Sequence, residues 1–187
     1  MLAYVFWHWP QPGIDRATYV DHLREFHQTL ASHKPSGFQH SVVFRIRGAN
    51  WLNTQDNAYE EWYLLDGSAA MDQLNDAAVS GACEEPHNRV AREAADGIGG
   101  LYRLRTGQEN LAAARFAMWL SKPAGVSYND FYAALQPLTS QPGVALWGRQ
   151  MTLGPTTEFC LHSLTEIELP QLLTTKAVAR HELELTF

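Results

Sequence analysis

The sequence has few basic residues and few cysteines. Its 14 lysines and arginines are outnumbered by 20 aspartates and glutamates, which gives a formal charge of −6 at pH 7. A main partner such as nucleic acid or an anionic membrane normally demands a basic face, so we expect neither. Cys83 and Cys160 form no CxxC pair, and no apolar run long enough for a signal peptide or membrane span precedes the first predicted strand. We expect a cytoplasmic protein with two reduced thiols.

The common catalytic and metal-binding motifs are also missing. The sequence contains no nucleophile elbow, no glycine-rich phosphate loop, and no HxH, HxxxH or HExxH spacing. These absences argue against hydrolases, nucleotide-binding proteins and zinc sites. His8 and His40, which lie among aromatic residues, are therefore interpreted as core or rim histidines. We expect no metal and no cofactor.

What the sequence does contain is an amphipathic helix preceded by an aromatic strand. In residues 12–30 an apolar stripe recurs at helical spacing, and it consists of Tyr19, Leu23, Phe26 and Leu30. A similar stripe follows the later strand ARFAMWLS and consists of Phe131, Leu135 and Leu138. Gly13 and Gly125 are separated by the same number of residues along the chain as Trp7 and Trp119. The chain is therefore predicted to use one strand-and-helix motif twice.

Each half is predicted to have the order strand, helix, strand, strand, helix, strand. In the first half, 1–107, the strands are expected at 2–9, 38–48, 59–66 and 101–106, and an extra helix is expected at about 84–96, closed by glycines. The second, shorter half, 112–187, is expected to place its last helix at 166–178. Asp15 and Ser127 are the predicted N-caps of the two first helices.

This order is the ferredoxin-like βαββαβ unit, a four-stranded antiparallel sheet with helices on one face. The first strand is apolar on both sides, with Tyr4 and Phe6 on one and Val5, Trp7 and Trp9 on the other. The face that the helices leave bare must therefore also be buried. We expect an α+β fold in which two tandem ferredoxin-like sheets close into one eight-stranded barrel with helices outside.

This arrangement resembles the dimeric α+β barrel superfamily in a form that fuses both half-barrels in one chain. The first half is similar to EthD-type domains, on the strength of Pro12, Gly13, Tyr19, His27 and Leu30. Thr139 stands at the position of the second half that matches His27. The resemblance implies a site in the first half alone. Members of the superfamily include cofactor-independent monooxygenases, lactone isomerases and haem-handling enzymes.

His27 is the predicted catalytic residue, because it borders the buried face of the helix, where an imidazole can act as a base or hold a substrate carbonyl. A structural histidine bonded to a neighbouring carbonyl is the alternative. The remaining predicted site residues are aromatic or polar side chains expected to surround a ligand: Tyr4, Trp7, Tyr19, Trp62, Asn75 and His87. The aromatic rings could instead fill the barrel as core, and the segment 80–100 could be either a lid or a plain helical addition.

Three functional hypotheses follow. The first is a protein that binds or converts a small apolar or aromatic metabolite without a metal. The second is a barrel packed solid that serves as an interaction or stress-related module, and the third is a haem binder. A homodimer formed through a sheet edge or a helix face is compatible with each of them.

Overall fold

The computed structural model describes residues 1–47, 49, 51–52, 57–152, 157–173 and 179–187. The first half of the chain forms β1 (Leu2–Pro10), α1 (Arg16–His33), β2 (Phe38–Ile46), β3 (Ala58–Leu65), α2 (Ala69–Ala78), α3 (Glu84–Glu93) and β4 (Ala94–Gly107), with a short 3₁₀ turn, η1 (Gly81–Cys83), before α3. The second half forms β5 (Phe116–Leu120), α4 (Tyr128–Thr139), β6 (Ala145–Thr152), β7 (Phe159–Ser163) and β8 (Ala179–Leu185).

The eight strands close into an antiparallel barrel in the order β1-β3-β2-β8-β5-β7-β6-β4. Within each half the order is that of a ferredoxin-like sheet, with the first and third strands in the middle. The halves meet where β2 pairs with β8 and where β4 pairs with β6. The predicted fold class is therefore confirmed.

The inside of the barrel is filled by aromatic side chains from both halves. Alternate residues of a strand point to opposite faces, and Trp7 of β1 and Trp62 of β3 share the interior with Trp119 and Trp147 of the second half. All four indoles are fully buried. The ring centroids of Trp7 and Trp119 are 5.2 Å apart and those of Trp62 and Trp147 are 5.1 Å apart. The interior therefore holds the two sheets together as a packed core.

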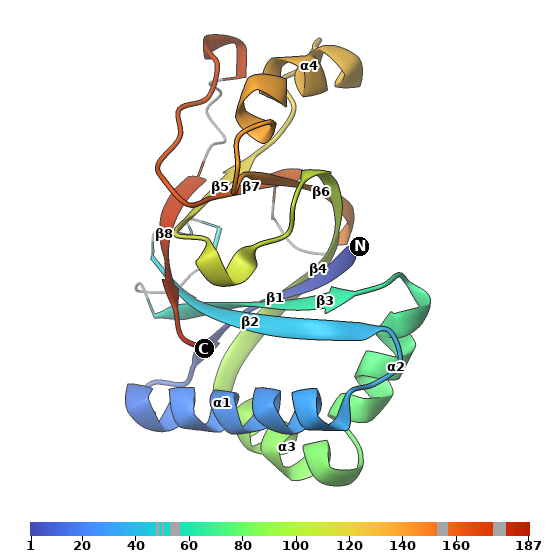
Figure 1. The fold of residues 1–187 in the computed structure, drawn as a ribbon. Helices are drawn as coiled ribbons and strands as arrows, with labels where there is room; N and C mark the ends of the chain where they lie inside the picture. The colour runs from blue at the N-terminus through green and yellow to red at the C-terminus, as the bar shows by residue number, and fades with distance from the viewer. Residues whose placement is uncertain (48, 50, 53–56, 153–156, 174–178) are drawn as a thin grey trace.

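The helices cover the outside of the barrel in two groups. Figure 1 shows α1, α2 and α3 together on one side and α4 on the opposite side. The predicted stripe of α1 is buried, and the side chain of Asp15 caps this helix by accepting from Thr18 N. Ser127 caps α4 in the same way through Asp130 N. The sequence thus predicted both helix starts correctly.

Several elements differ from those expected. The extra helix ends at Glu93, and β4 begins directly at Ala94, so that the glycines expected to close the helix lie inside the strand. Pairing with β1 holds this glycine-rich stretch extended, which shows tertiary contacts overriding weak strand propensity. The predicted helix at 166–178 is wrong over its first part, because 166–170 are not helical and only a 3₁₀ turn, η3 (Gln171–Leu173), follows. The rest of that prediction, 174–178, lies outside the described residues.

Closure of the barrel bears on how two copies of the chain could meet. Each of the eight strands pairs with a neighbour on both sides, but the pairing of β2 with β8 covers only Phe44–Ile46. A homodimer through a strand edge or a helix face therefore stays a prediction. None of the described helices is long and apolar enough to cross a membrane.

Candidate functional site

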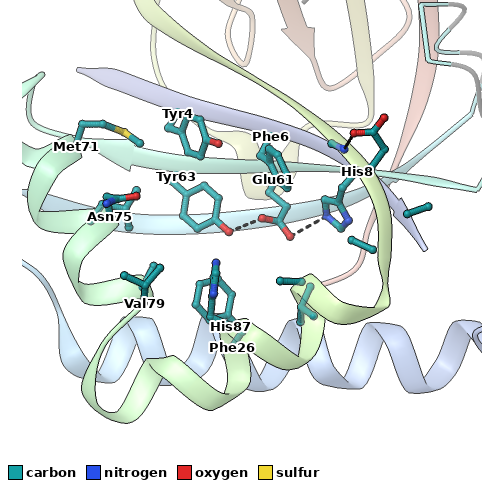
Figure 2. Close-up of a pocket in the computed structure, with 18 residues that line it drawn as sticks. Tyr4, Phe6, His8, Phe26, Glu61, Tyr63, Met71, Asn75, Val79 and His87 are labelled. Atoms are coloured by element: carbon teal, nitrogen blue, oxygen red, sulfur yellow. Dashed lines mark hydrogen bonds and ion pairs between the residues drawn. The ribbon is translucent and has the colours of Figure 1, made fainter. Parts of the chain in front are cut away.

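A pocket of about 470 Å³ lies outside the barrel, between the first-half sheet and its helices. Its floor comes from β1 and β3, its walls from α1, α2 and α3, and one rim from the start of β4 (Figure 2). It is lined by Tyr4, Phe6, His8, Phe26, Glu61, Tyr63, Met71, Leu74, Asn75, Ala78, Val79, His87, Val90, Ala91, Ala94, Ala95, Asp96 and Gly97. Most of these side chains are apolar or aromatic, as is usual for a small-molecule site.

Two glycines of β4 make room for the aromatic wall. A Cβ atom added at Gly97 would lie 2.3 Å from Phe6 Cζ, and one added at Gly99 would lie 2.9 Å from the Tyr4 hydroxyl oxygen. The rings of Phe6 and Tyr4 therefore lie across β4 where any larger residue would displace them. The glycines of the 80–100 segment thus shape the pocket rather than end a helix.

Glu61 is the polar centre of the pocket floor. His8 Nε2 lies 2.9 Å from Glu61 Oε1, and the Tyr63 hydroxyl donates a hydrogen bond to Oε2 (Figure 2). His27 approaches from α1, with Nε2 at 3.5 Å from Oε1. Glu61 is only 3% exposed, so these three side chains replace the water that an exposed carboxylate would have.

The charge of Glu61 fixes the direction of the hydrogen bonds. Burial alone would raise the pKa of this carboxyl, but the charges and hydrogen bonds of His8 and His27 outweigh burial and hold its pKa well below the usual range. An ionised carboxylate can only accept, so His8 donates through Nε2. Its Nδ1 lies 2.7 Å from the Tyr19 hydroxyl oxygen. The chain Tyr19, His8, Glu61 thus runs from the helix to the pocket floor.

The two tyrosines beside Glu61 stay protonated over a wide pH range. Burial, followed by the nearby charge of Glu61, raises the pKa of Tyr4 to about 12. The same causes, and the hydrogen bond to Glu61, raise the pKa of Tyr63 well above its usual value of 10.0. Both phenols are therefore available as neutral hydroxyl groups to a molecule in the pocket.

A second buried carboxylate lies on the other face of β3. Glu60 Oε2 accepts from Trp7 Nε1 and Glu60 Oε1 accepts from Trp62 Nε1, each at 2.7 Å. His162 Nε2 is 3.9 Å from Glu60 Oε1. This group lies inside the barrel, where it orients two of the core indoles.

The structure separates the predicted site residues into three sets. Tyr4, Asn75 and His87 line the pocket. His27 and Tyr19 lie one layer behind it and contact the Glu61 network, His27 stacking on Tyr63 at 5.1 Å and donating or accepting at Ser41 Oγ at 2.7 Å. Trp7 and Trp62 point into the barrel interior, so Trp62 does not line the pocket that Tyr4 lines.

The site residues predicted from the sequence do not include Glu61, and His8 is interpreted there only as a core or rim histidine. The run YEEWYLL does carry a signal, because two carboxylates inside a strand of eight buried residues require partners on both faces. The partner of Glu61 on β1 is His8. It is brought there because β1 pairs with β3 in a register that places Phe6 opposite Glu61. That pairing, and hence the partner, is not visible in the sequence alone.

Comparisons with known proteins place the fold. Neither family models nor curated protein sequences match the chain. Among solved structures, a candidate monooxygenase from Lactobacillus acidophilus is similar with a TM-score of 0.59 and 11% identity over 100% of this chain and 94% of the other. An anthrone oxidase-like protein follows with a TM-score of 0.54 and 8% identity over 98% and 91%.

A candidate chlorite dismutase is similar with a TM-score of 0.53 and 11% identity, over 100% of this chain and 96% of that one. At such low identities these likenesses establish the architecture and not the activity. Together with the strand order, they show that the chain has the fold of the dimeric α+β barrel proteins, with both half-barrels in one polypeptide.

Proposed function

We propose that the chain binds a small aromatic molecule in the pocket and holds the polar group of that molecule against Tyr63 and Glu61. The observation that carries this proposal is Glu61 itself, a buried, ionised carboxylate on the floor of a mostly apolar pocket. Burying such a charge costs stability even when it is paired. A site that acts on a ligand gives the fold a reason to keep it.

The shape and lining of the pocket support an aromatic ligand. Tyr4 and Tyr63 stack at 5.8 Å, and Phe26 and His87 meet edge to face at 5.6 Å. Val79, which is 46% exposed, lies at the rim and gives the pocket an apolar lip. Flat apolar molecules match such walls through stacking and burial of apolar area.

The hydrogen bond between Tyr63 and Glu61 provides the polar contact for a ligand. Tyr63 donates a hydrogen bond to Glu61, so the Tyr63 oxygen keeps lone pairs that can accept from a hydroxyl or N–H group of the ligand. Because the pKa of Glu61 is lowered, its carboxylate is a weak base that holds a polar group by hydrogen bonding and does not take a proton from a phenol or from a carbon beside a carbonyl. The two groups therefore support binding of an aromatic molecule that carries a hydrogen-bond donor.

His27 acts in this proposal as a positioning residue. It is not among the residues that line the pocket, and its contacts are with Glu61, Tyr63 and Ser41. It therefore orients the two groups that meet the ligand. In this proposal Glu61 and Tyr63, rather than His27, meet the ligand directly.

The test is a panel of neutral aromatic molecules screened by thermal shift and followed by titration calorimetry. We expect at least one neutral aromatic to stabilise the protein, with affinity reduced about tenfold by Tyr63→Phe, since a hydrogen bond near a charged group contributes about 1.5–3 kcal/mol. Tyr128→Phe is the matched control, because Tyr128 also donates to a glutamate but lies on α4. If no panel member binds, or if both variants weaken binding equally, the proposal fails and the packed-module hypothesis is favoured.

Haem fits this pocket poorly. Iron needs an imidazole nitrogen that is free to coordinate, and both ring nitrogens of His8 are hydrogen-bonded. His87 offers Nε2 from the wall, because its Nδ1 is the nitrogen that lies 3.3 Å from Asn88 Oδ1. The residues that the structure describes around the pocket include no lysine or arginine to meet the propionates. The candidate chlorite dismutase among the similar structures therefore supports the fold but not this cofactor.

A further inference from the structure

The ionisable side chains that line the pocket include two carboxylates but no lysine or arginine. Glu61 lies on the floor and Asp96 on the rim, and among the described lining residues there is neither lysine nor arginine. The arginines of α3 are engaged elsewhere, with Arg89 2.8 Å from a carboxylate oxygen of Glu25 and Arg92 3.0 Å from one of Glu85. No permanent positive charge therefore faces a ligand from these walls.

The pocket histidines are engaged with neighbouring side chains. His8 Nε2 lies 2.9 Å from Glu61 Oε1, and His87 Nδ1 lies 3.3 Å from Asn88 Oδ1. Among the described lining residues, Glu61 is the buried carboxylate that a ligand meets on the pocket floor.

The nearby helix ends also disfavour a negatively charged ligand. Val79 follows the last residue of α2, and Ala94 follows the last residue of α3, and both line the pocket. A helix C-terminus carries the negative end of the helix dipole. The α3 end is capped by Gln11, whose backbone N–H donates to Glu93 O and whose Nε2 donates to Arg92 O. This cap is uncharged, so it adds no attraction for an anion.

Resting on the proposed function, we propose that the pocket selects its ligand by charge: it takes an uncharged or cationic aromatic molecule and excludes the carboxylate of the same skeleton. An anion would have to lie close to Glu61 in a site shielded from water, where like charges repel strongly. A cation would instead pair with that carboxylate and with the faces of the surrounding rings.

The experiment measures dissociation constants at pH 8 for three molecules that share one ring system, namely 2-naphthylmethanol, 2-naphthylmethylammonium and 2-naphthoate. We expect the alcohol or the amine to bind at least tenfold more tightly than the carboxylate. Glu61→Gln, which removes the buried charge, is expected to narrow that ratio at least threefold.

A second variant keeps the test informative if Glu61→Gln fails to fold. Val79→Lys places a cation on the exposed rim, where a charged side chain can be accommodated, and it should improve binding of 2-naphthoate relative to the alcohol at least threefold. Met151→Lys is the matched control, because Met151 is 59% exposed in β6 and is not part of the pocket lining. It should leave the ratio unchanged.

The outcomes separate the inference from the function on which it rests. Equal binding of all three probes, or tightest binding of 2-naphthoate, overturns charge selection and leaves the aromatic pocket standing. A ratio that changes equally in Val79→Lys and Met151→Lys also overturns it, because the effect would then come from net charge. Failure of all three probes to bind overturns the proposed aromatic pocket and charge selection with it.

Discussion

Glu60 and Glu61 are consecutive residues that bury their carboxylates on opposite faces of one strand. Glu60 accepts from Trp7 and Trp62 inside the barrel, whereas Glu61 accepts from His8 and Tyr63 on the floor of the outer pocket. The two carboxylates therefore have separate partners. Substitution of each by the isosteric glutamine can separate the role of the core from that of the pocket.

Glu61→Gln should change how the free energy of unfolding depends on pH at acidic pH. Because the pKa of Glu61 is lower in the folded protein than its usual 4.5, its ionised form stabilises the fold above about pH 4.5, and this contribution is lost as pH falls toward the folded pKa. We expect the variant to be less stable at pH 7 by about 1–3 kcal/mol, with the difference shrinking as pH falls to about 3. Urea denaturation at a series of pH values measures this, and two parallel curves would contradict it.

Glu60→Gln should affect stability and leave the pocket unchanged. A glutamine offers one oxygen where Trp7 and Trp62 now donate to two, so one indole N–H loses its partner at a cost of about 1–3 kcal/mol. Ligand affinity, measured by calorimetry, should stay within about twofold of wild type. A large loss of affinity in this variant would show that the barrel interior and the pocket are coupled.

Gly97→Ala should narrow the pocket and strain its wall. The new Cβ would lie 2.3 Å from Phe6 Cζ, so the ring must shift, and overpacking of this kind costs about 1–3 kcal/mol. Gly67→Ala is the control, because a Cβ there has no atom within 4 Å and should change stability by less than about 0.5 kcal/mol. Thermal unfolding compares the two, and equal melting temperatures would show that Phe6 has room to move.

The barrel could be predicted because its determinants are periodic. Alternation along β1 assigns Val5 and Trp7 to one face and Tyr4 and Phe6 to the other, and the structure keeps these two sets apart. Since both sets are apolar, both faces need cover: the helices cover one face, and closure of the two sheets covers the other.

The position of the pocket could not be predicted in the same way. Alternation defines two sets of residues but not which set faces the interior, so the sequence does not reveal that Trp62 and Tyr4 lie on opposite sides of the sheet. The run Ala94–Gly99 has two glycines and little strand propensity, and only its pairing with β1 makes it a strand that borders the pocket.

Haemin should not form a specific complex through this pocket. Of the two histidines that line the pocket, His87 is the one with a ring nitrogen available to iron. The described lining provides no lysine or arginine for the propionates. We expect titration of the protein with haemin to leave the Soret band at the position of free haemin. A shifted band that disappears in His87→Ala would contradict this and would revive haem binding.

His27→Ala distinguishes the positioning role from direct contact with a ligand. The imidazole is 4% exposed and contacts Tyr63, Glu61 and Ser41, so its loss leaves a cavity and unpaired groups worth about 1–3 kcal/mol of stability. If His27 acts through its neighbours, ligand affinity should fall less than it does in Tyr63→Phe. His33→Ala, on the exposed end of the same helix, should change neither property. Complete loss of binding with unchanged stability would instead place His27 in direct contact with the ligand, as its position in the sequence suggested.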